Sequence, residues 1–198
     1  MAHAARNFDS LSELTERFAG GNMKGSMARA HIDWVRDHRG RDEVIDFFEA
    51  VPYRMRNVLA ASWYSFEDAM KLDRIIMNRF GDSDLRFLEQ LGAYSARLNL
   101  TGVYRFFQRA GVHEFFRSSA RLHAQFQDFG TAEYRELSPC EGQMIHADYP
   151  SYSPLYCSSA IGFYRTCIEL HGGKDVDVWE SHCQCRGEAT CTFEMLWG

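Results

Sequence analysis

The cysteines of this chain gather near its C-terminus, at spacings suited to binding a metal ion. Cys157 begins an apolar segment with a helical pattern, and a β-hairpin is predicted further along the chain. Cys183 ends the first hairpin strand, Cys191 begins the second, and Glu180 stands three positions before Cys183. Closing the hairpin brings these side chains together, and the helix N-terminus supplies Cys157. Three thiolates and one carboxylate form a tetrahedral set that zinc accepts.

The fourth ligand is open on spacing alone. His182 would supply an imidazole, and Cys185, in the predicted turn, would complete an all-thiolate site. A regular strand places Glu180 and His182 on the same face, so alternation does not choose between them. Buried cysteines without a ligand are common, and disulfides are a third interpretation. The clustering, and a sequence without a secretion signal, favour a metal site.

Four short motifs resemble a known family: Pro154-Leu-Tyr-Cys157, Gly162, Glu180-Ser-His-Cys183 and Gly187-Glu-Ala-Thr-Cys191-Thr-Phe. They are similar to the end of the 4-vinyl reductase-type domain. That domain occurs in bacteriochlorophyll vinyl reductase-related proteins and in the sensory region of sigma-54 activators of aromatic catabolism. In those sensors three cysteines and a glutamate hold zinc at matching spacings. The resemblance implies that the zinc ligands are Cys157, Glu180, Cys183 and Cys191.

The apolar periodicity changes near the middle of the chain. Residues before Gly130 follow a helical period, with capping residues and glycines between the segments. Beyond Gly130 we predict strands at 132–137 and 141–146, a helix at 155–170, and strands at 175–180 and 190–195. This is an α+β fold with a helical half and a β-β-α-β-β antiparallel sheet. The same order matches the fold that 4-vinyl reductase-type domains share with trafficking-complex (TRAPP) subunits.

Length and charge limit the possible partners. The 198 residues, 45% of them hydrophobic, are enough for one integrated domain, with a helical region at 1–130 and an α+β zinc-binding region at 131–198. A formal charge of -5 provides no overall basic field for nucleic acid. No apolar run reaches the roughly twenty residues of a membrane span. We expect a cytoplasmic protein.

Aromatic residues point to a ligand pocket. They make up 14% of the sequence, and the resemblance implies a cavity between helices and sheet for a small apolar or aromatic molecule. Plain core packing is the competing interpretation. We expect this pocket to be lined by His146, Phe106, Phe107 and Trp179.

The predicted function is ligand sensing rather than catalysis. The sequence has no glycine-rich phosphate loop, no G-x-S-x-G or H-E-x-x-H motif, and no dinucleotide fingerprint. We therefore expect a zinc-containing sensory or regulatory module that signals through a protein partner. The alternatives are a TRAPP-like dimeric scaffold and a reductase acting on a tetrapyrrole.

Paired phenylalanines suggest a homodimer made by the helices before Gly130. The helical stripe at 44–51 and the pairs Phe47-Phe48, Phe106-Phe107 and Phe115-Phe116 exceed the apolar surface that one sheet face covers. Surplus apolar surface on a chain without a membrane span indicates an interface.

Overall fold

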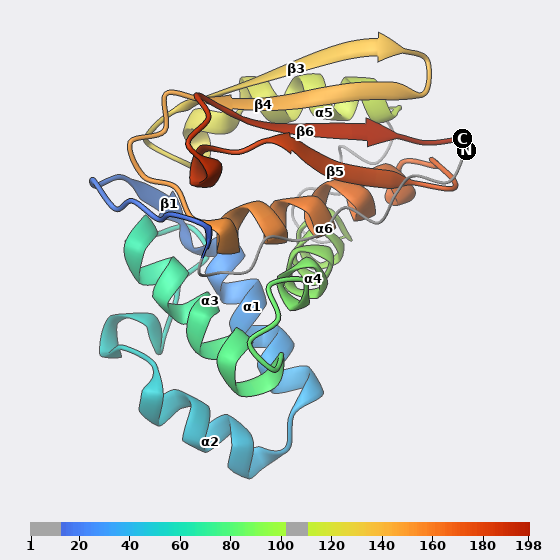
Figure 1. Ribbon diagram of the computed structural model, residues 1–198. Coiled ribbons are helices and arrows are strands. Elements are labelled where there is room, and N and C mark those ends of the chain that lie inside the picture. The colour runs from blue at the N-terminus through green and yellow to red at the C-terminus, as the bar shows by residue number, and fades with distance from the viewer. Residues whose placement is uncertain (1–12, 102–110) are drawn as a thin grey trace.

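The computed structural model describes residues 13–101 and 111–198, which form a helical lobe beside a four-stranded sheet (Figure 1). The main helices are α1 (Gly25–His38), α2 (Arg41–Ala50), α3 (Phe66–Phe80), α4 (Phe87–Thr101), α5 (Val112–Arg121) and α6 (Pro154–Leu170). The strands are β1 (Asn22–Lys24), β2 (Trp63–Ser65), β3 (Thr131–Ser138), β4 (Glu141–Ala147), β5 (Asp177–His182) and β6 (Cys191–Leu196). Short 3-10 turns are η2 (Tyr53–Met55), η4 (His123–Gln125) and η5 (Gln184–Arg186).

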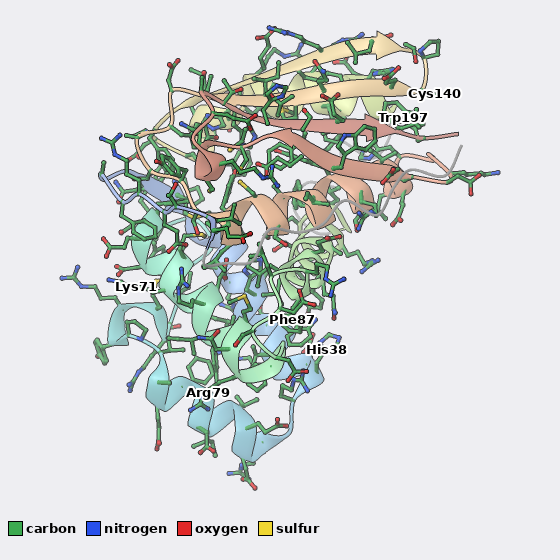
Figure 2. The ribbon with its side chains drawn as sticks, in the orientation of Figure 1. His38, Lys71, Arg79, Phe87, Cys140 and Trp197 are labelled. Carbon is green, nitrogen blue, oxygen red and sulfur yellow. The ribbon has the colours of Figure 1, made fainter. Side chains whose placement is uncertain are left out.

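Local sequence signals set the limits of the helical lobe. The Ser65 hydroxyl accepts a hydrogen bond from the Asp68 amide at the start of α3, and Gly81 follows its last residue. One stripe of α3 is apolar and buried against α1 and α2, and it includes Phe66 at the first position of the helix and Ile76 further along. In the same lobe Phe87 packs edge-on against Trp34, whose ring stacks on His38 (Figure 2).

The sheet is antiparallel, with the strand order β3-β4-β6-β5. Alternate side chains of the strands point toward α5 and α6 and are buried there, as at Met144 and Phe193. The opposite face of β3 carries exposed charges, including Glu133 and Arg135. The predicted α+β class and the β-β-α-β-β order of the C-terminal part are therefore confirmed. The N-terminal helices do not cover the outer face of β3, and its charged side chains are exposed to solvent.

Helices α4 and α6 cross where each carries a glycine. A Cβ atom on Gly92 would lie 1.9 Å from the Ser159 carbonyl oxygen, and one on Gly162 would lie 1.9 Å from the Glu89 carbonyl oxygen. Two backbones can approach this closely only where a side chain is missing from each. The crossing connects the helical lobe to the layer that covers the sheet.

The apolar residues proposed as a dimer surface are mostly inside the molecule. Phe47 and Phe116 are fully buried, Phe115 is 5% exposed, and the Phe48 ring is covered by the Arg36 guanidinium. These rings complete the two hydrophobic cores, so they are not surplus surface. Residues 106 and 107 lie outside the described part of the chain. No helix in the described ranges has both the length and the apolar character of a transmembrane span.

Candidate functional site

The structure brings together the four residues predicted as metal ligands. One ligand atom from each of Cys157, Glu180, Cys183 and Cys191 lies within 4.8 Å of the other three. The Cys157 sulfur is 3.7 Å from that of Cys191 and 4.0 Å from that of Cys183. Cys157 lies in the first turn of α6, after Pro154 and the Ser153 cap. The hairpin of β5 and β6 supplies Glu180, Cys183 and Cys191. We call these four residues the cysteine cluster.

A β-bulge decides which neighbour joins the cluster. Glu180 pairs with Phe193 and His182 pairs with Thr192, so Ser181 is an extra residue in β5. The bulge breaks the alternation that the sequence predicts, and the exposed side chain of His182 faces solvent instead of sharing the face of Glu180. Cys185 is 1% exposed in η5, beside the cluster, without belonging to the group of four.

The cluster holds a buried carboxylate that lacks a hydrogen-bond partner on one oxygen. Glu180 Oε1 is buried without a partner, and Arg186 Nη1 lies 3.9 Å from Oε2. Burial, followed by charge on Cys183, raises the pKa of Glu180 to about 8. Hydrogen bonding within the cluster, from the Cys157 thiol first, lowers the pKa of Cys183. The backbone N–H of Gln184 also donates a hydrogen bond to the Cys191 sulfur at 3.4 Å. Chemically, such a set accepts a thiophilic cation.

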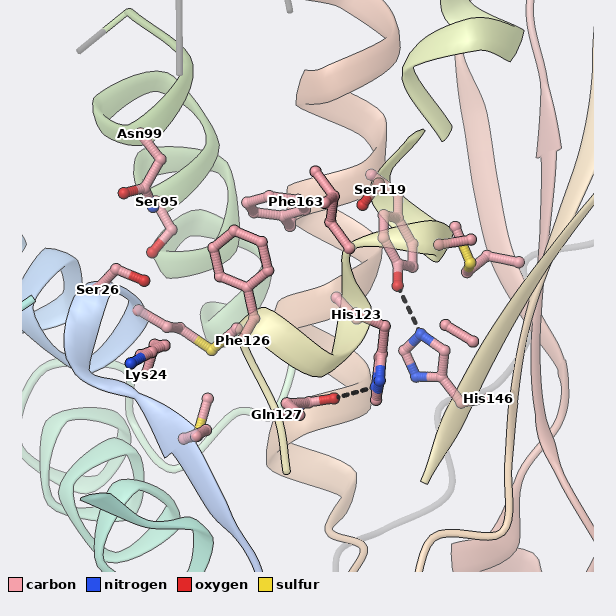
Figure 3. A pocket seen from close by; sticks show the side chains of 18 of the residues that line it. Lys24, Ser26, Ser95, Asn99, Ser119, His123, Phe126, Gln127, His146 and Phe163 are labelled. Carbon is pink, nitrogen blue, oxygen red and sulfur yellow. Dashed lines mark hydrogen bonds between the residues drawn. The ribbon is translucent and has the colours of Figure 1, made fainter. Parts of the chain in front are cut away.

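A cavity of about 180 Å³ lies between the helical lobe and the sheet (Figure 3). Its walls come from β1, α1, α4, α5, η4, the sheet and α6. Figure 3 shows Ser26, Ser95 and Asn99 on one side and His123 and His146 on the other. The rings of two further wall residues, Phe126 and Phe163, lie between these sides.

Hydrogen bonds connect the polar groups on the histidine side of the cavity. His146 Nε2 and the Tyr164 hydroxyl are hydrogen-bonded at 2.8 Å, and burial lowers the pKa of this imidazole to about 3. His123 Nε2 is 2.7 Å from Gln127 Oε1, which also accepts from the Tyr149 hydroxyl at 2.6 Å. Burial lowers the pKa of His123 as well. The two imidazoles are therefore neutral groups, and each is hydrogen-bonded through Nε2 to a neighbouring side chain.

The structure describes two of the four predicted pocket residues, and one of these two lines the cavity. His146 lines it, whereas Trp179 does not, because it alternates to the other face of β5 from Val178. Phe106 and Phe107 lie outside the described residues. Ser95 and Tyr164 also line the cavity, although neither was predicted from the sequence. A usable signal was present for Tyr164, because the i, i+4, i+8 spacing of positions 156, 160 and 164 marks one helix face.

The cavity and the cysteine cluster are direct neighbours. His146 is the cross-strand partner of Cys191, and Tyr156, which accepts a hydrogen bond from Gln127 Nε2 at 2.9 Å, precedes Cys157 in α6. A third link is a 3.3 Å hydrogen bond from Gln184 Nε2 to the Tyr149 carbonyl. The cysteine cluster and the cavity wall therefore lie on adjacent residues of α6 and on paired residues of β4 and β6.

Comparison with known proteins identifies the fold through solved structures. No protein-family model and no curated protein sequence matches the chain. An H-NOX protein from S. oneidensis in the Fe(II)NO ligation state matches with a TM-score of 0.72 at 12% identity, covering 89% of this chain and 99% of that one. An unliganded Fe(II) H-NOX mutant from K. algicida matches with a TM-score of 0.70 at 14% identity, covering 89% and 97%. An oxygen-binding H-NOX domain related to soluble guanylate cyclases matches with a TM-score of 0.69 at 13% identity, covering 88% and 95%.

The fold is therefore that of H-NOX domains. This finding corrects the resemblance to 4-vinyl reductase-type domains and the TRAPP-like arrangement, because the matching structures are H-NOX proteins over nearly their whole length. It also corrects zinc as the cofactor. That assignment came from the same resemblance, and the group named for solved H-NOX structures is heme. A cluster of thiols and one carboxylate does not by itself identify zinc. The scaffold and tetrapyrrole-reductase alternatives depended on the same resemblance and lose their support with it.

Proposed function

We propose that this chain is a cytoplasmic ligand-sensing module that holds a small, mostly apolar molecule between its helices and its sheet. The observation that carries the proposal is the cavity of about 180 Å³, whose wall combines aromatic and aliphatic side chains with a few buried polar groups. Support also comes from the fold, because solved structures with this fold are described as oxygen-binding and nitric-oxide-ligated domains. The cavity wall continues into the sheet and α6, where occupancy can alter the structure that a partner contacts.

Heme does not fit the cavity as the described residues form it. Pockets for drug-sized ligands measure about 300–1,000 Å³, and heme is larger than most such ligands. The Nε2 atoms of His123 and His146 are both engaged in hydrogen bonds. Heme also carries two carboxylates, and the one cation among the described lining residues, Lys24, donates to the Ala61 carbonyl at 2.9 Å. The proposed ligand is therefore smaller than heme.

Native mass spectrometry of gently purified protein tests this proposal. We expect the folded protein to retain, or to bind when supplied, a molecule no larger than a substituted single ring. Absorption spectroscopy after incubation with hemin is the companion measurement, and we expect no stoichiometric Soret band. One bound heme per chain would contradict the proposal, as would failure of every small apolar compound tested to raise the melting temperature.

We also propose that the cysteine cluster binds a metal ion whose identity is to be measured. The support is the convergence of Cys157, Glu180, Cys183 and Cys191, with a buried Glu180 oxygen that has no hydrogen-bond partner. Such an ion would tie the start of α6 to the hairpin of β5 and β6. Four protein ligands leave no position for a substrate, so its role would be structural.

Elemental analysis of the purified protein tests this second proposal. We expect about one thiophilic metal ion per chain, lost in Cys183→Ser together with much of the folded population. Cys167→Ser is the matched control, because Cys167 is a fully buried thiol of α6 outside the cluster. This variant should keep the metal, and its free energy of unfolding should fall by only about 1–3 kcal/mol, which is the cost of a buried polar group without a partner. A metal-free protein whose melting curve does not respond to chelator would contradict the site.

Signal output through a protein partner, and dimerisation of the helical lobe, complete the proposal. Several large apolar side chains are exposed in this lobe: Ile45 on α2, Tyr53 on η2, Leu59 in the loop between η2 and β2, and Trp63 on β2. They replace the buried phenylalanine pairs as the surface to test. Sedimentation at micromolar concentration, with Tyr53→Asp as the variant, measures whether copies associate there.

A further inference from the structure

The side of the cavity opposite the histidines has a hydroxyl group without a partner. Ser95 is 1% exposed on α4, it lines the cavity, and its Oγ is buried with no hydrogen-bond partner. Asn99 lies one helical turn further along the same face, and Ser26 of α1 lies near both (Figure 3). A buried polar group without a partner costs roughly 1–3 kcal/mol, so a ligand that bonds to Ser95 recovers that cost.

The volume of the cavity limits the ligand to about one ring. An engineered apolar cavity of about 150 Å³ holds one benzene molecule. The cavity here, at about 180 Å³, has room for a six-membered ring and one small substituent. The rings of Phe126 and Phe163 lie between its two polar sides and offer an apolar surface for that ring (Figure 3).

The charges around the cavity indicate a neutral ligand. No carboxylate is present among its described lining residues, and the ammonium of Lys24 is directed to the Ala61 carbonyl and lies 4.1 Å from the centre of the Trp63 ring. On the histidine side the Nε2 atoms of His123 and His146 already have hydrogen-bond partners, whereas Ser95 Oγ is buried without one. An anionic substituent would lose its hydration without gaining a described cation.

We infer that the cavity takes a neutral, single-ring molecule with one hydroxyl, carbonyl or amide group, and that this group bonds to Ser95 Oγ. The inference rests on the proposed ligand-sensing function and adds the ligand class and the residue that selects it. Ser95 acts here as a specificity-determining residue. The remaining contacts of the ligand are apolar and contribute through burial.

The inference is tested by titrating the full chain with toluene, benzyl alcohol and benzoate and measuring binding by two-dimensional NMR. We expect benzyl alcohol to bind more tightly than toluene, and benzoate to bind least. In Ser95→Ala the affinity for benzyl alcohol should fall roughly threefold to tenfold, which is the effect of one hydrogen bond, while toluene binding should stay the same. The Ser159→Ala variant is the matched control, because Ser159 Oγ is equally buried and unpartnered but does not line the cavity.

The possible outcomes separate the inference from the function beneath it. If none of the three probes binds, the proposed pocket function itself fails. If toluene and benzyl alcohol bind but Ser95→Ala weakens neither, or both variants weaken benzyl alcohol equally, the pocket stands and the role of Ser95 is refuted. Benzoate binding as tight as that of benzyl alcohol would refute the neutral ligand class. Loss confined to benzyl alcohol in Ser95→Ala supports both parts of the inference.

Discussion

His146 illustrates how its surroundings set the properties of a single side chain in this protein. It is 3% exposed, its ring stacks on Tyr149 with a centroid distance of 5.2 Å and an interplanar angle of 3°, and its Nε2 is hydrogen-bonded to Tyr164. Burial, and then charge on His123, lowers the pKa of His146 to about 3. The neutral imidazole is thus held in place in the cavity wall near neutral pH by its hydrogen bond with Tyr164.

Stability should fall below pH 6.5 because of this residue. In the unfolded chain a histidine binds a proton near pH 6.5, whereas folded His146 does so only near pH 3. Between these values the unfolded state holds more protons, so the free energy of unfolding decreases with falling pH, by up to about 1.4 kcal/mol per unit. Urea denaturation from pH 7.5 to 4.5 measures the slope. His146→Gln keeps an acceptor for Tyr164 and should flatten it; identical slopes would contradict this assignment.

At the scale of elements, the crossing of α4 and α6 positions both parts of the candidate site. Helix α6 carries Cys157 of the cysteine cluster and Tyr164 of the cavity, and α4 carries Ser95. Their separation depends on Gly92 and Gly162, whose missing side chains allow the two backbones to touch. The geometry of the cavity therefore depends on two residues that do not line it.

Replacing Gly162 with alanine should push the two helices apart. The added methyl would lie 1.9 Å from the backbone oxygen of Glu89, which cannot rotate away as a side chain can. We expect a loss of about 2–4 kcal/mol in the free energy of unfolding, measured by chemical denaturation, and weaker binding of small ligands. Gly111→Ala is the control, because no atom outside its immediate chain neighbours lies within 4 Å of its added methyl. As the N-cap of α5 it should lose only about 1 kcal/mol, the cost of alanine at a capping position. Equal losses in both variants would contradict the crossing as the cause.

For the whole molecule, the question is whether the helical region and the sheet region unfold together. Two hydrophobic cores exist, one around α1 and α3 and one beneath the sheet. Helices α4 and α6 contribute to both, since Leu88 and Leu155 belong to the first core while Ala96 and Ile161 belong to the second. This sharing supports one integrated domain, with residues 1–130 and 131–198 as its parts.

Substitutions in either core should therefore shift one common unfolding transition. We expect Leu88→Ala to cost about 2–5 kcal/mol and Phe193→Ala about 3–5 kcal/mol, because both side chains are fully buried. Far-ultraviolet circular dichroism and tryptophan fluorescence should follow the same curve in each variant. Tyr53→Ala, at a residue 86% exposed, is the neutral control. Two separable transitions would show that the regions are independent domains.

The sequence by itself determined the strands of the main sheet, α6 and the three cysteines of the candidate metal site, because these depend on local pattern. Periodicity and glycines place the sheet strands and α6 nearly where the structure has them. The hairpin spacing likewise predicts the meeting of Cys157, Cys183 and Cys191. Spacing left Glu180, His182 and Cys185 open as the fourth ligand, and only the family resemblance favoured Glu180. The family resemblance drawn from short motifs was wrong, because the solved structures that match nearly the whole chain are H-NOX proteins.

Only the tertiary structure decided the orientation of His182, the burial of the phenylalanine pairs and the position of the cavity. A single bulge in β5 turns His182 to solvent, and the packing of separate helices covers Phe47 and Phe116. The cavity wall joins Ser95 of α4 to His146 of β4, residues that no local period relates. Local sequence encodes which face of an element is apolar, whereas the partner of that face is fixed by contacts between distant segments, summed over the whole fold.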